Sequence, residues 1–314
     1  MQATVIYNRN ANGANQITPD EIKTAFHKLG FDPVYKLTSS QQDLDPILAE
    51  TDEGLVVVAG GDGTFRAVAT RLIGKNLLLT IVPLGTANNI ARALQIHRTP
   101  KEIFQGLNYP VEYKFDVGYM RGPWGEDYFL EGAGFGLFAD MLVKSDPSQG
   151  KSILRSAQAI FENFIDHATY YPKVAIDGEE ISEAHLLVEV LNTPAIGPRL
   201  KFAPEADPSD GLFDVVRIRK VEHENLLSYT KGLFFEELPD YDGVELSRAK
   251  RIDVHWTGFA FHIDGEVRPE QPPKPVDQDP AFGARPTTHG PTDDSMVTIE
   301  ILPGALTLWL PTFG

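Results

Sequence analysis

Residues 55–73 read LVVVAGGDGTFRAVATRLI, which passes directly from a strand pattern through a glycine-rich turn into a helix pattern. Leu55–Val58 is a continuous apolar, mostly β-branched run, typical of a strand buried on both faces of a parallel sheet. After the turn, apolar residues recur at helical spacing from Phe65 to Ile73. The stretch therefore predicts a strand–turn–helix unit of an α/β domain.

The same pattern recurs on both sides of this stretch. Leu77–Val82 predicts the next strand, followed by a second glycine turn and a helix that extends to Leu94. Upstream, Thr4–Tyr7 predicts the first strand and Val34–Leu37 the second. This alternation predicts an α/β domain over residues 1–117, with its binding site at the carboxyl ends of the strands.

A helix is predicted between the first two strands. Thr18 is a suitable N-cap, Pro19 fits the first helical position, and Glu21 completes a capping box. Gly30 is a typical residue just beyond a helix C-terminus.

The turn Gly60-Gly61-Asp62-Gly63-Thr64 has the composition of a phosphate site. Glycines let backbone N–H groups approach an anion closely, and the N-terminus of the following helix adds partial positive charge. Asp62 by itself repels phosphate, so it indicates a divalent cation between carboxylate and phosphate, as in phosphoryl transfer from a nucleotide. A turn that needs glycine only for its geometry is the alternative, which the embedded acid disfavours.

A second turn of this kind, Gly85-Thr86-Ala87-Asn88, follows the next predicted strand. Taken alone, Thr86 and Asn88 are better explained as helix caps than as phosphate ligands. Adjacent parallel strands bring their following turns to one edge, so the phosphate-binding interpretation gains weight beside the first turn.

Beyond residue 117 the pattern changes to short strands with hairpin signals, which predicts a mostly antiparallel β-rich domain over residues 118–314. The predicted strands are Lys173–Ile176, Leu186–Leu191, Leu212–Ile218, Ile252–Trp256, Met296–Leu302 and Leu306–Leu310. Helices are predicted over 153–167 and 225–235, and residues 269–294 predict an exposed or disordered loop.

The composition excludes several classes of protein. The 314 residues include 28 Lys and Arg against 44 Asp and Glu, a net charge of −16 that disfavours nucleic acid as a partner. No cysteine is present, which removes disulfides and thiol chemistry and fits a cytoplasmic location. The start lacks a signal-peptide pattern, and no apolar run approaches about 18 residues. We therefore expect a cytoplasmic protein whose contact with membranes is peripheral.

Three motifs together resemble the diacylglycerol kinase catalytic-domain family, which includes soluble bacterial lipid kinases and is related to the sphingosine and ceramide kinases. They are GGDGTFRAV at 60–68, PLGTANNIAR at 83–92 and HIDGE at 262–266. The first motif alone is shared with NAD kinases and phosphofructokinases, so the combination carries the resemblance, which runs over nearly the whole chain. It implies an α/β ATP-binding domain followed by a β-sandwich lipid-substrate domain, with the active site in the cleft between them.

The resemblance also implies roles for individual residues. Asp62 would serve the catalytic Mg²⁺, while Asn8 and Thr38 occupy positions that contact nucleotide in the family. The remaining implied nucleotide-binding residues are Gly60, Gly61, Gly63, Thr64, Gly85, Thr86 and Asn88. Two positions depart from the family pattern, because Arg9 replaces a frequent proline and Asn89 replaces an aspartate.

Asp264-Gly265-Glu266 matches the catalytic acid of the family, and Glu266 is the implied general base. A lipid hydroxyl is a poor nucleophile, and a carboxylate within hydrogen-bond reach can accept its proton. Asp177-Gly178-Glu179 has the same letters and is interpreted as an ordinary type I′ hairpin turn. The residues alone do not distinguish the two copies.

The segment Asp207-Pro208-Ser209-Asp210-Gly211-Leu212 resembles a loop that holds a non-catalytic Mg²⁺ in family members. The carboxylate of Asp210 and the carbonyls of Asp207 and Leu212 would supply oxygen ligands, which suit a hard cation. A plain Asp-Gly turn before a strand explains the same letters equally well.

The preferred interpretation is a lipid kinase that transfers the γ-phosphate of ATP to a hydroxyl of a diacylglycerol-like or sphingoid lipid, with Mg²⁺ as cofactor. A ribose kinase similar to NAD kinase is the enzyme alternative, and a regulator that has lost catalysis is the other. The expected partners are ATP and a lipid at a membrane surface, and a homodimer is compatible with the sequence. Lys144, Lys151 and Arg155 are the candidate basic cluster for docking on anionic lipid.

Overall fold

The computed structural model describes residues 1–38, 43–51, 53–144, 170–219, 243–271 and 296–313. The chain forms two compact units. Unit 1 comprises Met1–Val117, Pro208–Asp210 and Leu302–Gly314, and unit 2 comprises Gly118–Asp207 and Gly211–Ile301. The helices predicted over 153–167 and 225–235, and most of the loop predicted over 269–294, lie outside the described residues.

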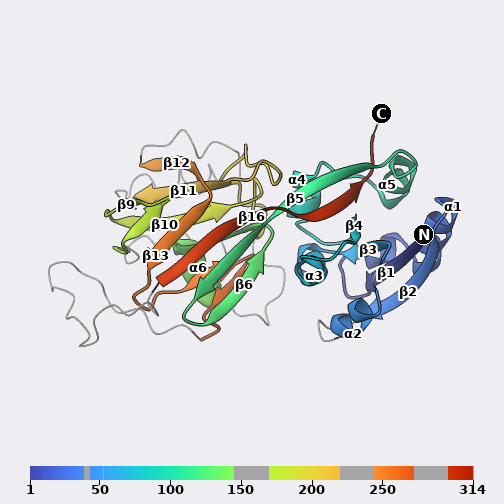
Figure 1. Ribbon diagram of the computed structural model, residues 1–314, viewed down its shortest axis with the longest axis horizontal. Helices are drawn as coiled ribbons and strands as arrows, with labels where there is room; N and C mark the ends of the chain where they lie inside the picture. Colours follow the sequence, from blue (N-terminus) through green and yellow to red (C-terminus); the bar gives the residue numbers. More distant parts are fainter. Residues whose placement is uncertain (39–42, 52, 145–169, 220–242, 272–295, 314) are drawn as a thin grey trace. The chain divides into compact units, whose positions relative to one another are not determined.

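Unit 1 is built on parallel strands in the order β2-β1-β3-β4 (Figure 1). The strands are β1 (Gln2–Asn8), β2 (Asp32–Thr38), β3 (Leu55–Gly60) and β4 (Leu78–Pro83). All residues of β3 are buried, as its continuous apolar run predicts. Because the three pairings are parallel, the carboxyl ends of these strands lie at one edge.

The helices of unit 1 are α1 (Pro19–Lys28), α2 (Leu44–Ala49), α3 (Asp62–Ala69), α4 (Asn89–Ala93) and α5 (Pro100–Gly106). The predicted capping box of α1 is confirmed, because Thr18 Oγ1 accepts from the Glu21 N–H at 3.2 Å and the Glu21 carboxylate accepts from the Thr18 N–H at 2.7 Å. Ile22 and Phe26 form the buried face of α1.

Unit 2 contains an antiparallel sheet in the order β12-β11-β10-β7-β14-β15. These strands are β7 (Gly132–Gly136), β10 (His185–Leu191), β11 (Phe213–Arg219), β12 (Val244–Ala249), β14 (Phe261–Ile263) and β15 (Glu266–Arg268). In the same unit, β13 (Arg251–His255) pairs with β8 (Val174–Ile176) and with the first part of β16 (Met296–Leu310). Strand β8 continues into β9 (Glu179–Ile181), and β5 (Val111–Gly122) pairs with β6 (Gly125–Phe129).

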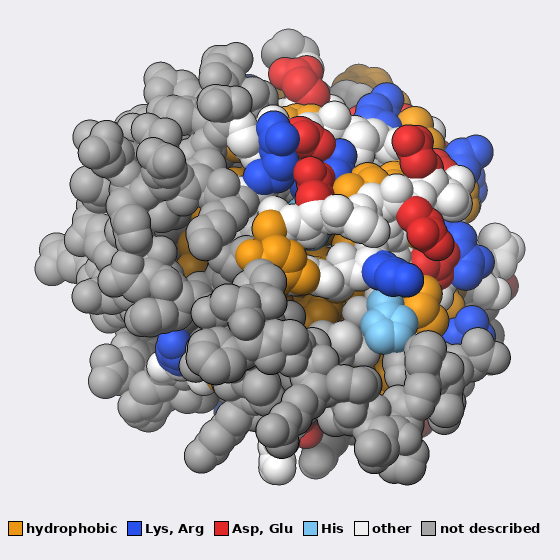
Figure 2. Space-filling model, turned by 90° about the vertical axis from the view of Figure 1, so that its left-hand side faces the viewer, with side chains coloured by type: hydrophobic (Ala, Val, Ile, Leu, Met, Phe, Trp, Pro, Cys, Tyr) orange, Lys and Arg blue, Asp and Glu red, His pale blue; other side chains and the backbone are white. Residues whose placement is uncertain are grey.

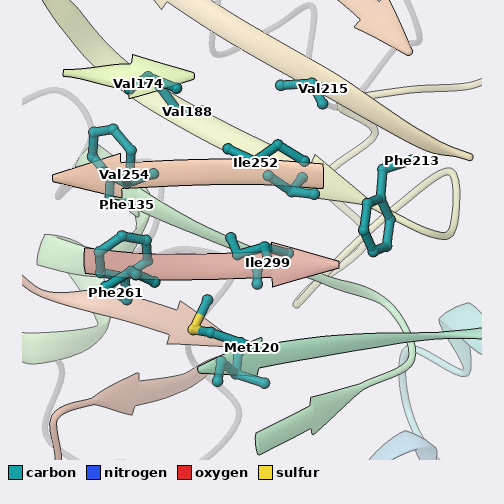
Figure 3. Packing of buried hydrophobic residues seen from close by; sticks show 14 of the residues in the cluster. Met120, Phe135, Val174, Val188, Phe213, Val215, Ile252, Val254, Phe261 and Ile299 are labelled. Atoms are coloured by element: carbon teal, nitrogen blue, oxygen red, sulfur yellow. The ribbon is translucent and has the colours of Figure 1, made fainter. Parts of the chain in front are cut away.

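The main core of unit 2 lies between its strands, where large apolar side chains point toward one another (Figure 3). Phe135 and Phe261 of the six-stranded sheet pack in one cluster with Val254 and Ile299 of β13 and β16. Each fully buried side chain of this size contributes about 1.5–3 kcal/mol to folding. A second cluster joins the other face of β10 to helix α6 (Leu137–Lys144).

The C-terminal segment corrects two of the predicted strands. Met296–Leu302 and Leu306–Leu310 are parts of one strand, β16, although Gly304 within it has φ +58°. The Gly304 N–H donates to the buried carboxylate of Asp116 at 2.6 Å, which holds this interruption inside the strand. Thr307 and Leu308 pair in parallel with β4, and Leu302–Gly314 is part of unit 1.

Several strands were not predicted, and for β7 the reason is that its sequence lacks a strand pattern. β7 reads Gly-Ala-Gly-Phe-Gly yet lies within the six-stranded sheet, paired with β10 and β14. The fold class is nevertheless the predicted one, an α/β unit with a parallel sheet and a mostly antiparallel β-rich unit.

Candidate active site

The two glycine turns contact each other at the carboxyl edge of the unit 1 sheet. A Cβ atom placed on Gly61 would lie 3.0 Å from Gly85 Cα, and one placed on Gly85 would lie 2.7 Å from Gly61 Cα. A Cβ atom on Gly60 would lie 2.7 Å from the Thr64 Cβ. The prediction that both turns meet at one edge is confirmed, and glycine is required there because the two backbones approach so closely.

Asp62 is the first residue of α3 and joins the two turns. Its Oδ1 accepts a hydrogen bond from the backbone N–H of Ile90 in α4 at 3.2 Å. Burial raises the pKa of its carboxyl, and backbone N–H groups of residues 88–90 act in the opposite direction. The carboxylate therefore has a structural partner in the protein, and its side chain stays partly exposed at the sheet edge.

Asn8 and Thr64 are brought together as well. Asn8 Nδ2 donates to Thr64 Oγ1 at 2.8 Å, and Asn8 Oδ1 accepts from the Asn10 N–H at 2.9 Å. Thr38 lies beside Asn8, its register partner on β2, but only 4% of it is exposed. The structure thus places Asn8 and Thr64 at the edge and leaves Thr38 largely covered.

The second turn corrects the helix-cap interpretation. Asn88 adopts a left-handed conformation with φ +50° and makes no side-chain cap to α4. Its amide instead closes the turn, since Oδ1 accepts from the Gly85 N–H at 2.9 Å and Nδ2 donates to the Gly85 carbonyl at 3.0 Å. Asn88 therefore shapes the turn from inside.

Asn12 is a site residue that sequence reasoning missed. Its Nδ2 donates to Thr86 Oγ1, and the neighbouring Gly13 N–H donates to the Leu84 carbonyl at 2.8 Å. The segment after β1 thus folds over the second turn. Four of its eight residues from Asn8 to Asn15 are asparagines, and this composition was the local signal in the sequence.

Both Asp-Gly-Glu copies are two-residue hairpin turns of the same kind. Asp264 and Gly265 have φ +47° and +81°, and Asp177 and Gly178 have φ +47° and +87°, as type I′ turns require. The carboxylate of Asp264 accepts the backbone N–H groups of Leu130, Glu131 and Gly132 at 2.8–3.0 Å. The carboxylate of Asp177 similarly accepts those of Lys250 and Arg251. The two aspartates are thus anchors, and backbone geometry does not separate the two glutamates.

Glu266 belongs to unit 2, whereas the glycine turns belong to unit 1. Its side chain is 47% exposed and pairs with Arg268 Nη2 at 3.1 Å. Arg268 also contacts Asp127 of β6, from Nε to Oδ2 at 2.7 Å. The predicted general base is therefore accessible and lies in an ion-pair network that the sequence did not indicate.

The Asp207–Leu212 segment is a loop before β11 in which Gly211 has φ +75°. Nearby Asp214 is buried, and burial together with the charges of Asp207 and Glu205 raises its pKa to about 6. In the part of the chain that the structure describes, no three His, Asp or Glu side chains are placed to share a metal ion. The predicted set of one carboxylate with the carbonyls of Asp207 and Leu212 thus remains a prediction.

By its fold and its candidate site, the protein belongs to the class that combines a glycine-turn α/β unit with an antiparallel β unit. Residues 2–120 match the family model for the diacylglycerol kinase catalytic domain, and residues 149–309 match that for the YegS C-terminal NAD kinase beta sandwich-like domain. The chain belongs to the diacylglycerol kinase catalytic-domain family.

Individual relatives agree with this assignment. A diacylglycerol kinase of Bacillus subtilis is 27% identical over 224 residues, covering 68% of this chain and 71% of the relative. One from Staphylococcus saprophyticus is 25% identical over 283 residues, covering 84% and 88%. A crystal structure of a diacylglycerol kinase from Bacillus anthracis shares the fold, with a TM-score of 0.64, 21% identity and coverage of 98% and 96%. None of the described helices is long and apolar enough to cross a membrane.

Proposed function

We propose that this protein is a lipid kinase that uses ATP and Mg²⁺ to phosphorylate a hydroxyl of a diacylglycerol-like or sphingoid lipid. The observation that carries the proposal is the contact between Gly61 and Gly85, since it brings the backbones of two glycine turns together at the N-terminus of α3. Backbone N–H groups at such a place suit the phosphates of a nucleotide. Gly63 supports this, because no atom lies within 4 Å of where its Cβ would be.

Asp62 fits a role in holding Mg²⁺. Its oxygen ligand is of the kind that this hard cation prefers, with substrate phosphates completing the set. Burial raises the pKa of its carboxyl, and a cation bound beside it would act in the opposite direction by favouring the ionised form. Mg²⁺ bound there would neutralise the charge that develops on the transferred phosphoryl group.

Glu266 is the proposed general base. The lipid hydroxyl oxygen forms a bond to the γ-phosphorus while the bond from that phosphorus to the bridging oxygen breaks. The hydroxyl proton passes to the Glu266 carboxylate, and ADP leaves. The exposure of this carboxylate supports the assignment, because a substrate hydroxyl has to reach it.

The lipid acceptor implies peripheral contact with a membrane. Lys144 is exposed, while Lys151 and Arg155 of the predicted basic cluster lie outside the described residues. On the face shown in Figure 2, the described basic and acidic side chains are interspersed. The proposed contact with anionic lipid therefore rests on the predicted basic cluster, of which Lys144 is the described member.

A ribose kinase is the second candidate, because the model matched by residues 149–309 is described as similar to the NAD kinase sandwich. The test supplies labelled ATP with diacylglycerol or sphingosine in mixed micelles, and separately with NAD. We expect labelled phosphate in the lipid alone. Labelled NADP without labelled lipid would favour the ribose kinase, and transfer to neither acceptor would favour a regulator.

A further inference from the structure

Arg268 connects the proposed base to a second acid. It lies in β15, two residues after Glu266, and its Nη2 donates to Glu266 Oε2 at 3.1 Å. The same guanidinium donates from Nε and Nη2 to the Asp127 carboxylate, at 2.7 and 3.3 Å. Asp127 comes from β6, about 140 positions earlier, so the network ties separate parts of unit 2 together.

The guanidinium is nearly fully used within the protein. An arginine has five N–H donors. Nε and both donors of Nη2 contact the two carboxylates, and Nη1 donates to the Val267 carbonyl at 3.0 Å. Arg268 is only 16% exposed, against 47% for Glu266. This arrangement suits a group that holds Glu266 better than one that binds substrate phosphate.

Two anchors act on the same short hairpin. Asp264 fixes the backbone of the turn through three N–H groups of Leu130–Gly132. Arg268 fixes the side chain of Glu266, and Asp127 fixes Arg268. A general base requires this control, because displacement by about 1 Å can cost roughly 10²-fold in rate.

We propose that Arg268, held by Asp127, is a positioning residue that orients the Glu266 carboxylate for proton abstraction. The inference rests on the proposed function of Glu266. The positive charge also favours the ionised carboxylate, which a base needs in order to accept a proton. The second negative charge of Asp127 offsets part of this effect and keeps Arg268 from turning toward substrate.

A matched control exists in the same unit. Arg251 pairs with Asp253 at 2.8 Å and with Glu300 at 2.7 Å, beside the non-catalytic Asp177 turn. It thus forms a similar network of one arginine and two acids without contact to Glu266. Loss of the Arg251 network should cost little stability because Arg251 is half-exposed, whereas Arg268 and Asp127 are largely buried, so the stability of each variant is measured as well.

The experiment measures kcat, KM and pH–rate profiles for Arg268→Gln, Arg268→Lys, Asp127→Asn and Arg251→Gln with labelled ATP and diacylglycerol micelles. We expect Arg268→Gln to lower kcat about 10- to 100-fold with unchanged KM for ATP, and to move the acidic limb of the profile to higher pH. Arg268→Lys should restore part of the rate, Asp127→Asn should lie between Arg268→Gln and wild type, and Arg251→Gln should match wild type.

Glu266→Gln is measured in parallel to separate two failures. If it loses activity while Arg268→Gln and Asp127→Asn keep wild-type rate and pH profile, the positioning role is wrong and the proposed base stands. If Glu266→Gln stays fully active, the assignment of the base is wrong and the positioning role falls with it. Thermal melting shows whether each variant is folded, and if Arg268→Gln is not, Arg268→Lys and Asp127→Asn decide the outcome. If Arg268→Gln and Arg251→Gln lose equal activity and the pH profile does not change, Arg268 has only a structural role and the proposal is wrong.

Discussion

At the scale of single residues, Asp62 has two roles, and one substitution can separate them. Its Oδ1 accepts the Ile90 N–H, which couples the two turns, and its charge is the proposed partner of Mg²⁺. Asp62→Asn keeps an oxygen acceptor for the backbone bond but removes the charge. We therefore expect a folded protein whose rate of phosphoryl transfer falls by orders of magnitude.

The matched control is Asp177→Asn, which removes a carboxylate that also accepts backbone N–H groups but lies in the other hairpin. The measurement is kcat with saturating ATP and lipid, together with the melting temperature. A near-normal rate for Asp62→Asn would mean that the cation is held by other groups.

Only some residues of the candidate site could be predicted from the sequence. The glycine turns and their aspartate can be recognised as local sequence patterns. The contact of Gly61 with Gly85 could then be predicted, because the two turns follow neighbouring strands. Two hydrogen-bonded pairs, Asn12 with Thr86 and Arg268 with Asp127, join residues that lie far apart in the sequence. No local pattern encodes such pairs, since they depend on how strands are placed in three dimensions.

At the scale of elements, β7 shows why some strands escaped prediction. A Gly-Ala-Gly-Phe-Gly sequence has low strand propensity, yet Glu189 of β10 and His262 of β14 both lie opposite Gly134. Glu189 Oε2 and His262 Nε2 are 2.6 Å apart with both side chains fully buried. The glycine leaves room for this pair, a reason that appears only once the sheet is assembled.

Gly134→Ala should therefore destabilise unit 2. The new Cβ would lie 2.3 Å from the Val188 carbonyl oxygen and 2.4 Å from Glu189 Oε2, so backbone as well as side chain must shift. We expect a loss of at least about 1–3 kcal/mol in the free energy of unfolding. Gly63→Ala, whose Cβ would meet no atom within 4 Å, is the control and should stay within about 1 kcal/mol of wild type by urea denaturation. Equal stability of the two variants would refute the steric argument.

The interrupted strand β16 is a second element that could not be predicted from its local sequence. Pro303 and Gly304 read as a break between two strands, and the sequence alone gives no reason to bridge it. The bond from the Gly304 N–H to buried Asp116 supplies that reason. Helix α1, by contrast, was predictable because Thr18, Pro19 and Glu21 are local signals that act on their own backbone.

At the scale of the whole molecule, the pKa of His185 predicts how the free energy of unfolding depends on pH. It is fully buried, and burial followed by the charge of Arg217 lowers its pKa from 6.5 to about 4. Between these two values the unfolded chain binds a proton that the folded chain does not. Unfolding free energy should therefore fall as pH drops through this window, by at most about 3 kcal/mol.

The measurement compares urea denaturation at pH 7 and pH 4.5 for wild type, His185→Gln and His27→Gln. His27 is exposed on α1 and serves as the control. We expect the loss on acidification to be smaller in His185→Gln and unchanged in His27→Gln. An equal loss in all three proteins would assign acid sensitivity to other groups.

The proposed phosphorylation of a lipid hydroxyl, with Glu266 as base, can be measured with a pair of matched variants. The initial rate at which label from ATP enters diacylglycerol is compared for wild type, Glu266→Gln and Glu179→Gln, with saturating lipid and folded protein. The two glutamates follow turns of the same backbone geometry, so a difference between the two variants cannot come from the type of turn. We expect labelled lipid from wild type, a rate lower by roughly 10²- to 10⁴-fold for Glu266→Gln, and a rate within about a factor of two for Glu179→Gln. Absence of labelled lipid from wild type, or equal rates for all three proteins, would contradict the proposal.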